Sequence, residues 1–158
     1  KIVSYLPERA FLDVNMKVIQ VLNYMRDFFA DFDKTKALEM LKRLSIDPEK
    51  KIKELSKGTR EKVQLIIMMC REAKLYLLDE PIGGVDPAAR DYILDTIIKN
   101  YNKDATVIIS THLIADVEPV LDEFIFIRNG EILQHSAVSD VEKDGKTVDS
   151  LFREVFKC

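Results

Sequence analysis

The sequence predicts an α/β fold, in which a parallel sheet with flanking helices is joined to an all-helical unit. Residues 9–73 carry apolar side chains at helical spacing and almost no strand-like run. From residue 74 onward, short apolar runs alternate with helical segments, as strands and crossover helices do in a parallel sheet. The chain has 158 residues, of which 47% are apolar, so it can build one domain with a substantial core.

A strand is expected at the start of the chain, followed by a helix. Residues 2–6 form a short apolar run that Pro7 ends. Asp13 or Asn15 is expected to cap the following helix. Five apolar side chains then recur every three or four residues, which predicts one helical face. They are Val18, Val21, Leu22, Met25 and Phe28.

Two more helices are expected before residue 74. Asp33 is the predicted cap of the second helix, which ends before Asp47-Pro48. Its inward residues are Ala37, Leu38, Leu41 and Leu44. The third helix follows Gly58. Its inward residues are Val63, Ile66, Ile67 and Cys70.

The next part of the chain supplies two strands of the predicted sheet. Leu75–Leu78 is a continuous apolar run, which is typical of a strand buried on both faces of a parallel sheet. Thr106–Ile109 is expected to be a second buried strand. A helix over residues 87–101 connects them, with proline in its first turn. A short helix is expected over residues 113–119.

A hairpin and a final helix are expected in the last third of the chain. Glu123–Arg128 and Glu131–Gln134 flank Asn129-Gly130, a strong signal for a two-residue hairpin turn. The final helix is predicted over Thr147–Phe156. Its inward residues are Val148, Leu151, Phe152 and Val155.

The bulk properties narrow the range of functions. The formal net charge of -3 gives no electrostatic reason to expect a nucleic-acid partner. No apolar run approaches the ~20 residues that a membrane-spanning helix needs, so we expect any link to a membrane to run through another chain or domain. Cys70 and Cys158 form no CxxC pair, which predicts free thiols in a reducing compartment.

Three short stretches carry most of the side chains that could do chemistry. They are Leu55-Ser56-Lys57-Gly58-Thr59, Leu75-Tyr76-Leu77-Leu78-Asp79-Glu80-Pro81 and Ser110-Thr111-His112. Asp79 and Glu80 end a strand, and ligands of open α/β sheets bind beyond the carboxyl ends of the strands. In the simpler interpretation these carboxylates only end the strand and begin a turn.

Ser56-Lys57-Gly58 opens a helix, where a hydroxyl and unpaired backbone N–H groups can meet an anion, and glycine allows a close approach. The simpler interpretation makes Ser56 an ordinary helix cap. Asp86 before Pro87 and His112 before the next helix could equally be caps. Glu8, after the first strand, could be a solvated loop charge.

The order and spacing of these stretches resemble the back half of an ABC-type ATPase, the nucleotide-binding domain of ABC transporters. The resemblance covers nearly the whole chain. It implies that residues 1–158 form a partial ABC ATPase domain. In this division residues 9–73 are the helical subdomain with the signature motif, and residues 1–8 and 74–158 are the distal part of the P-loop ATPase core.

The resemblance also implies the roles of the strand-end residues. Asp79 stands at the position of the Walker B carboxylate, which holds Mg²⁺, usually through water. Glu80 stands at the position of the residue that activates water for attack on the γ-phosphate of ATP. His112 stands at the position of the switch histidine, which contacts the γ-phosphate and the general base.

Further positions match the family with substitutions. Ser56, Lys57, Gly58 and Thr59 correspond to the signature loop, usually written LSGGQ, with Lys57 for the first glycine and Thr59 for glutamine. Glu8 stands where the family usually has the glutamine of the Q-loop. A glutamate offers only oxygen and charge there. Asp86 belongs to a stretch that resembles the D-loop, which crosses to a partner domain.

The P-loop pattern GxxxxGK[ST] is missing from this sequence. Its Gly145-Lys146-Thr147 has Asp140 where the first glycine is required, and we expect it to be the turn before the last helix. We therefore expect a C-terminal fragment of an ABC ATPase that lacks the Walker A half. Alone, it is expected to bind Mg-ATP weakly, not to hydrolyse it, and to associate through uncovered strands.

The implied function is that of the ATP-binding and ATP-hydrolysing subunit of an ABC transporter, in which ATP-driven closure of a dimer drives transport across a membrane. The implied partners are a second ABC ATPase domain and a transmembrane subunit, which would hold the chain on the inner face of the cell membrane, in the cytoplasm. Lys57, Glu8 and the turn at residues 128–131 resemble bacterial multidrug or antibiotic exporters. Two alternatives stay open: a soluble ABC ATPase of DNA repair or translation, and an inert helical module for protein contacts.

Overall fold

The computed structural model describes residues 2–156, apart from the side chains of residues 88 and 89. The chain divides into two compact units, one up to Thr111 and one from His112 onward. None of the described helices is long and apolar enough to cross a lipid bilayer. The separate helical subdomain predicted for residues 9–73 stays a prediction.

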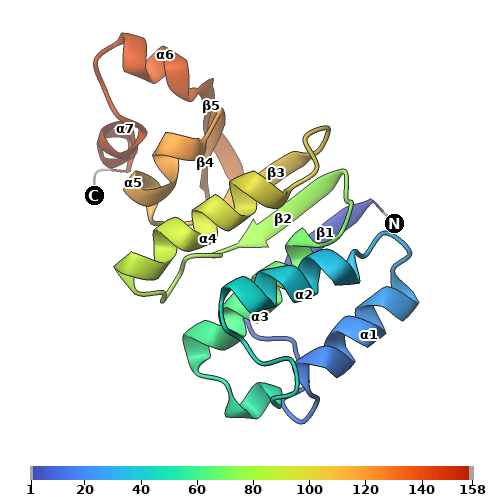
Figure 1. Cartoon of the computed structure of the whole chain (residues 1–158). Helices are drawn as coiled ribbons and strands as arrows, with labels where there is room; N and C mark the ends of the chain where they lie inside the picture. The colour runs from blue at the N-terminus through green and yellow to red at the C-terminus, as the bar shows by residue number, and fades with distance from the viewer. Residues whose placement is uncertain (1, 157–158) are drawn as a thin grey trace. The chain divides into compact units, whose positions relative to one another are not determined.

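The first unit is built on a three-stranded parallel sheet. Its strands are β1 (Val3–Leu6), β2 (Leu75–Asp79) and β3 (Thr106–Ser110), in the order β1-β2-β3 (Figure 1). Because the strands are parallel, their carboxyl ends lie along one edge of the sheet. The predicted α/β fold with a parallel sheet is confirmed.

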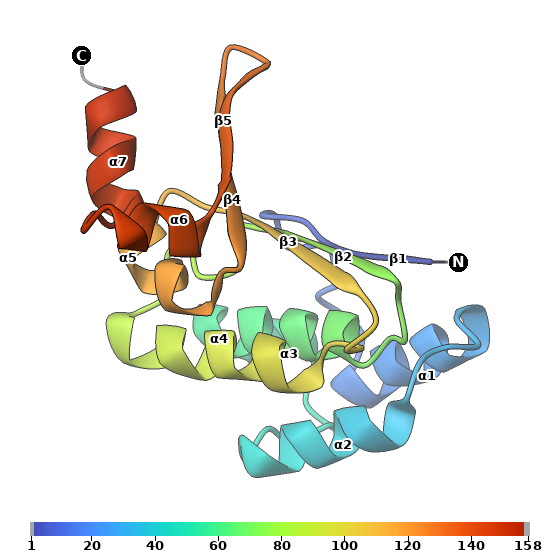
Figure 2. The ribbon, with the colours of Figure 1, turned by 90° about the horizontal axis from the view of Figure 1, so that it is seen from above.

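The helices of the first unit lie on one face of this sheet (Figure 2). Leu6, Tyr76 and Leu78 are buried, whereas Tyr5 and Ile108 are 52% and 49% exposed. The prediction that the run at residues 106–109 is buried on both faces is therefore wrong, whereas the side chains of the run at residues 75–78 are buried or half-buried. β3 pairs with a single neighbour and has exposed side chains at alternate positions.

Four helical segments precede β2 and one helix follows it. They are α1 (Val18–Phe28), α2 (Lys34–Arg43), the short 3₁₀ helix η1 (Ile52–Glu54), α3 (Lys57–Met69) and, after β2, α4 (Pro87–Asn100). All four predicted inward residues of α3 are buried. In α2, Ala37 and Leu41 are buried and Leu38 and Leu44 are half-buried. In α1 the stripe is buried except for Phe28, which lies in the last turn and stacks on Tyr24 with ring centroids 4.3 Å apart.

One predicted helix cap is confirmed and another is wrong. Asp33 caps α2, because its Oδ1 accepts a hydrogen bond from the Lys36 backbone N–H at 2.9 Å. Neither Asp13 nor Asn15 caps α1, whose cap position is Lys17. The Asp13 carboxylate instead accepts from the Asn15 N–H. The helix starts later than predicted because backbone hydrogen bonds hold the preceding loop to residues 48–53.

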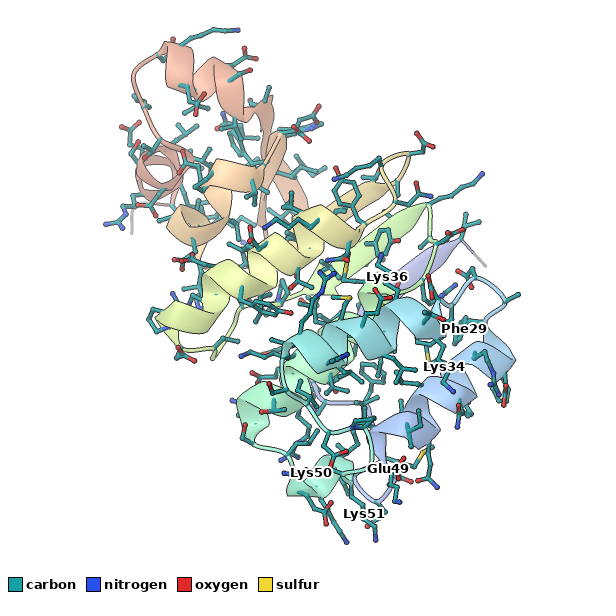
Figure 3. The ribbon with its side chains drawn as sticks, viewed as in Figure 1. Phe29, Lys34, Lys36, Glu49, Lys50 and Lys51 are labelled. Atoms are coloured by element: carbon teal, nitrogen blue, oxygen red, sulfur yellow. The ribbon has the colours of Figure 1, made fainter. Side chains whose placement is uncertain are left out.

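A buried ion pair ties the helices to the sheet. The Arg71 guanidinium donates to Asp31 Oδ2 at 2.7 and 3.1 Å and to the Val3 carbonyl at 2.9 Å. It also lies over the Phe29 ring, 4.1 Å from its centroid. Lys36, labelled on α2 in Figure 3, donates from its amine to the carbonyl of Asn100 at the end of α4 at 2.8 Å.

Cys70 ends α3 inside the core. Its thiol lies 3.7 Å from the sulfur of Met40, and burial raises the pKa of this thiol to about 12, although the charge of Lys36 opposes the shift. Cys70 is a free thiol, as predicted. Cys158 lies outside the described residues.

Alkaline pH is expected to destabilise the first unit through Cys70. The unfolded thiol ionises near pH ~8.5, whereas the folded thiol stays protonated to a much higher pH. The unfolded state therefore gains stability above pH ~8.5, and the free energy of unfolding falls by up to about 1.4 kcal/mol per pH unit. Urea unfolding of the parent chain and of Cys70→Ala between pH 7.5 and 10 tests this. Equal slopes against pH in both proteins would contradict it.

The second unit contains a hairpin packed against helices. Its elements are α5 (Ile114–Val117), the 3₁₀ helix η2 (Glu118–Val120), β4 (Glu123–Arg128), β5 (Glu131–Ala137), α6 (Val138–Lys143) and α7 (Val148–Val155). The predicted turn is confirmed, because Asn129 and Gly130 both have positive φ. β5 is longer than predicted, and the short, charged α6 was not predicted.

The core of the second unit lies between the hairpin and the last two helices. It contains Phe124, Phe126, Val138, Val141 and Val148, with Leu151, Phe152 and Val155 packed against it. Thr147 caps α7 by accepting a hydrogen bond from the Ser150 N–H at 3.1 Å. Gly145-Lys146-Thr147 is therefore the turn before the last helix, as predicted.

Candidate nucleotide site

Asp79 is fixed at the carboxyl edge of the parallel sheet. It is the last residue of β2 and lies in register with Ser110, the last residue of β3. The Ser110 hydroxyl donates to Asp79 Oδ1 at 2.5 Å. This short bond orients a half-buried carboxylate at the edge where α/β sheets bind ligands.

Glu80 follows in an unusual backbone conformation. Its φ is +46°, in the left-handed region that costs a residue with a side chain about 1–2 kcal/mol. Two hydrogen bonds hold this conformation: the Glu80 N–H donates to the Ser110 carbonyl at 2.9 Å, and the Gly83 N–H donates to the Glu80 carbonyl at 3.0 Å. The Thr111 hydroxyl donates to the Glu80 carboxylate at 3.1 Å.

Gly83 leaves the space that the Glu80 side chain occupies. A Cβ at position 83 would lie 3.2 Å from the Glu80 Cβ and 3.3 Å from its Oε2, closer than ordinary van der Waals contact. Glycine at position 83 therefore has a steric reason. It allows the Glu80 carboxylate to fold back against its own turn.

The start of α3 has the geometry of a capped helix. Ser56 is the cap, and its Oγ accepts from the Thr59 N–H at 3.2 Å and shares a hydrogen bond with the Thr59 hydroxyl at 2.8 Å. In this structure Ser56 is thus a helix cap, as the simpler interpretation of the sequence has it. A Cβ on Gly58 would meet nothing within 4 Å, so the backbone there is open to close approach.

Lys57 brings the start of α3 next to the turn that follows Glu80. Its Nζ lies 3.3 Å from the position that a Cβ on Gly84 would take. The same amine is 3.8 Å from a carboxylate oxygen of Glu61, and 79% of the Lys57 side chain is exposed. Burial raises the pKa of Glu61, and the charge of Lys57 lowers it. An exposed cation therefore stands beside the carboxylate-bearing turn.

The remaining predicted residues lie at different places. Glu8 is exposed and follows β1 at the same sheet edge, since Leu6 pairs with Leu78. Asp86 is exposed directly before α4. His112 is exposed and is the first residue of the second unit, so its place beside Glu80 stays a prediction.

Ser110 and Thr111 have roles in the site that the sequence analysis did not assign to them. They hold the two carboxylates, one each. One sequence signal could have indicated these roles. The two residues are a polar pair directly after an apolar strand, and the strands of a parallel sheet end at one edge. Only the register of β2 against β3 shows which hydroxyl meets which carboxylate.

A solved structure has the same fold. The ATP binding subunit of an ABC transporter matches with a TM-score of 0.83 and 25% sequence identity, over 98% of this chain and 68% of that one. The fold is therefore that of an ABC ATPase domain.

Sequence comparisons give the family. The model of the ABC transporter family matches residues 1–83. An uncharacterized ABC transporter ATP-binding protein of Methanocaldococcus jannaschii is 31% identical over 148 residues, which are 88% of this chain and 55% of the relative. The ABC-type transporter ATP-binding protein EcsA of Bacillus subtilis is 32% identical over 126 residues, 77% of this chain and 49% of that protein. The chain belongs to the ABC transporter family, and it spans about half the length of these relatives.

Proposed function

We propose that this chain is part of the subunit of an ABC transporter that binds and hydrolyses ATP. The observation that carries the proposal is the pair of carboxylates at the sheet edge, each held by a hydroxyl from the neighbouring strand end. In this proposal residues 9–73 are the helical subdomain, and residues 1–8 and 74–158 are the distal part of the ATPase core.

Asp79 is the proposed residue for Mg²⁺. Residues 2–156 contain no group of three or more His, Cys, Asp and Glu side chains that could hold a metal ion. Mg²⁺ bound with nucleotides commonly uses one or two carboxylates together with phosphate oxygens and water. Asp79, oriented by Ser110, fits that pattern. ATP supplies the γ-phosphoryl group, and Mg²⁺ offsets its charge.

Glu80 is the proposed general base. The Thr111 hydroxyl holds the Glu80 carboxylate in place, and a carboxylate can orient a water molecule and take its proton. His112 is proposed to contact the γ-phosphate and Glu80 when the site is assembled.

Residues from two ABC domains complete each proposed site. Ser56, Lys57, Gly58 and Thr59 face the γ-phosphate of an ATP held by the partner domain, where the helix N-terminus and the Lys57 amine supply positive charge. Asp86 contacts the partner, and Glu8 contributes oxygen near the metal. Two such domains would enclose two ATP molecules.

The proposed partner outside the ATPase pair is a transmembrane subunit, which would hold this chain at the cytoplasmic face of the cell membrane. The names of the relatives support it, because they are ATP-binding proteins of ABC transporters. Closure and opening of the domain pair would drive transport. Whether the transporter is an exporter stays a prediction.

Mg-ATP binding tests the proposal. The 158 residues contain no GxxxxGK[ST] pattern, so this chain by itself is expected to bind a fluorescent ATP analogue weakly and not to hydrolyse ATP. In a longer protein that contains both this chain and a GxxxxGK[ST] loop, called the natural full-length protein below, we expect saturable binding that Mg²⁺ strengthens. Asp79→Ala should remove most of the strengthening by Mg²⁺, because it removes the metal ligand.

Asp91→Ala, an exposed aspartate on α4, is the matched control and should leave the Mg²⁺ effect unchanged. Binding of equal strength with and without Asp79 would contradict the role given to this carboxylate. Tight binding by the 158-residue chain alone would show that it holds a phosphate site of its own.

A further inference from the structure

Gln64 is a buried amide in an otherwise apolar part of α3. It is 4% exposed, and Val63 and every residue from Leu65 to Met69 are also buried. A buried amide is costly unless it is hydrogen-bonded. The Gln64 Oε1 accepts a hydrogen bond from the Phe11 backbone N–H at 3.0 Å. This bond joins α3 to a loop that lies 53 positions earlier in the chain.

The loop that contains Phe11 follows β1 and begins with Glu8. It is also attached to the segment that leads into α3. The Lys53 N–H donates to the Val14 carbonyl at 2.9 Å, and the Val18 N–H donates to the Lys50 carbonyl at 3.0 Å. Figure 3 labels Lys50 in the connection between α2 and α3. The loop is thus bonded on both sides of the α3 N-terminus, before the helix and within it.

The attachment matters for the candidate site because α3 connects Gln64 to the helix cap Ser56. Gln64 lies two turns after the cap Ser56, about 12 Å along the axis at the usual rise per residue. Packed helices move as rigid elements because close-packed interiors deform little. A displacement of the loop at Phe11 would therefore be passed to the cap and first turn of α3, rather than absorbed between them.

We propose that Gln64 is a positioning residue that couples the loop carrying Glu8 to the N-terminus of α3. The inference rests on the proposed function, because it takes Glu8 and Ser56 to be residues that respond to nucleotide. In this arrangement a nucleotide that moves the Glu8 loop also reorients the helix whose start contacts the second nucleotide. Within the helix itself the coupling passes through one hydrogen bond, whose Gln64 end is buried among apolar residues. The backbone bonds to Val14 and Val18 reach only the segment before α3.

Two variants remove this hydrogen bond, one by removing its acceptor and the other by removing its donor. Gln64→Met keeps an unbranched side chain of similar length and removes the acceptor. Phe11→Pro removes the N–H donor at an exposed loop position, and Phe11→Ala is its matched control because it keeps the donor. Met69→Ala, at a buried position five residues further along α3, controls for a general loss of packing.

Hydrogen exchange in the natural full-length protein, with and without Mg-ATP, is the measurement. Without nucleotide, Gln64→Met should speed exchange of the Phe11 amide about tenfold, the order expected for one lost hydrogen bond, and Met69→Ala should not. With Mg-ATP, the parent and both controls should gain protection at residues 8–16 and at residues 57–60. Gln64→Met and Phe11→Pro should gain it only at residues 8–16.

The outcomes separate this inference from the proposed function. Protection at both segments in the two bond-removing variants would overturn the coupling alone. A parent protein without any response to Mg-ATP would overturn the proposed function and the coupling with it. If Phe11→Pro loses the protection that Mg-ATP gives residues 57–60 and Phe11→Ala keeps it, the coupling is supported even where Gln64→Met fails to fold.

Discussion

Replacing Glu80 by glutamine is expected to abolish most ATP turnover in the natural full-length protein while leaving Mg-ATP binding intact. The amide keeps the size of the side chain and can still accept the Thr111 hydrogen bond, but it cannot take a proton from water. A general base contributes about 100- to 10,000-fold to a rate, so the rate of ATP hydrolysis should fall by that factor. Phosphate release under single-turnover conditions measures it.

Glu39→Gln, at an exposed position on α2, is the matched control for the Glu80 variant. It makes the same chemical change away from the candidate site and should leave turnover unchanged. The two variants should also bind a fluorescent ATP analogue equally well. If Glu80→Gln hydrolysed ATP within a few fold of the parent rate, Glu80 would not be the base, and a structural role in the turn after β2 would remain.

The largest effect on stability is expected from Asp31→Ala. This change leaves the Arg71 guanidinium, whose side chain is 4% exposed, without its carboxylate partner. Breaking a buried ion pair by removing one partner costs about 3–5 kcal/mol. Asp31 is 24% exposed, so water can partly replace it, and we expect a loss of about 3 kcal/mol, at the lower end of that range. Urea unfolding followed by far-UV circular dichroism measures the loss.

Asp27→Ala provides the comparison for this ion pair. Asp27 also pairs with an arginine, Arg26, at 2.8 Å, but both side chains are more than half exposed. Exposed pairs contribute about 0–1 kcal/mol, so this variant should unfold close to the parent. Similar losses in Asp31→Ala and Asp27→Ala would show that burial does not set the strength of the Arg71 pair.

Much of the fold was predictable because local patterns and long-range packing agree. The apolar runs before Asp79 and before Ser110 form neighbouring parallel strands, and Asn129-Gly130 forms the hairpin turn. The exposed face of β3 was not predictable, since an apolar run of three residues does not tell an edge strand from a central one. The start of α1 was also missed, because hydrogen bonds to residues 48–53 delay it.

The candidate site likewise has one part that could be predicted from the sequence and one part that could not. Asp79 and Glu80 were recognisable from their position after an apolar strand. The hydroxyl partner of each carboxylate depends on the register of β2 against β3, and no local pattern contains that register. The proximity of Lys57 to Gly84 and the bond between Phe11 and Gln64 likewise join segments far apart in the sequence.

The left-handed backbone of Glu80 has a consequence for how this protein can change under selection. Glycine, or to a lesser degree asparagine, occupies that conformation at lower cost than glutamate. A laboratory screen that rewards only survival at high temperature would therefore tend to replace this residue. With Glu80 as the proposed general base, heat tolerance and ATP turnover would oppose each other at position 80, so a screen for hardier variants would need an activity requirement at every round.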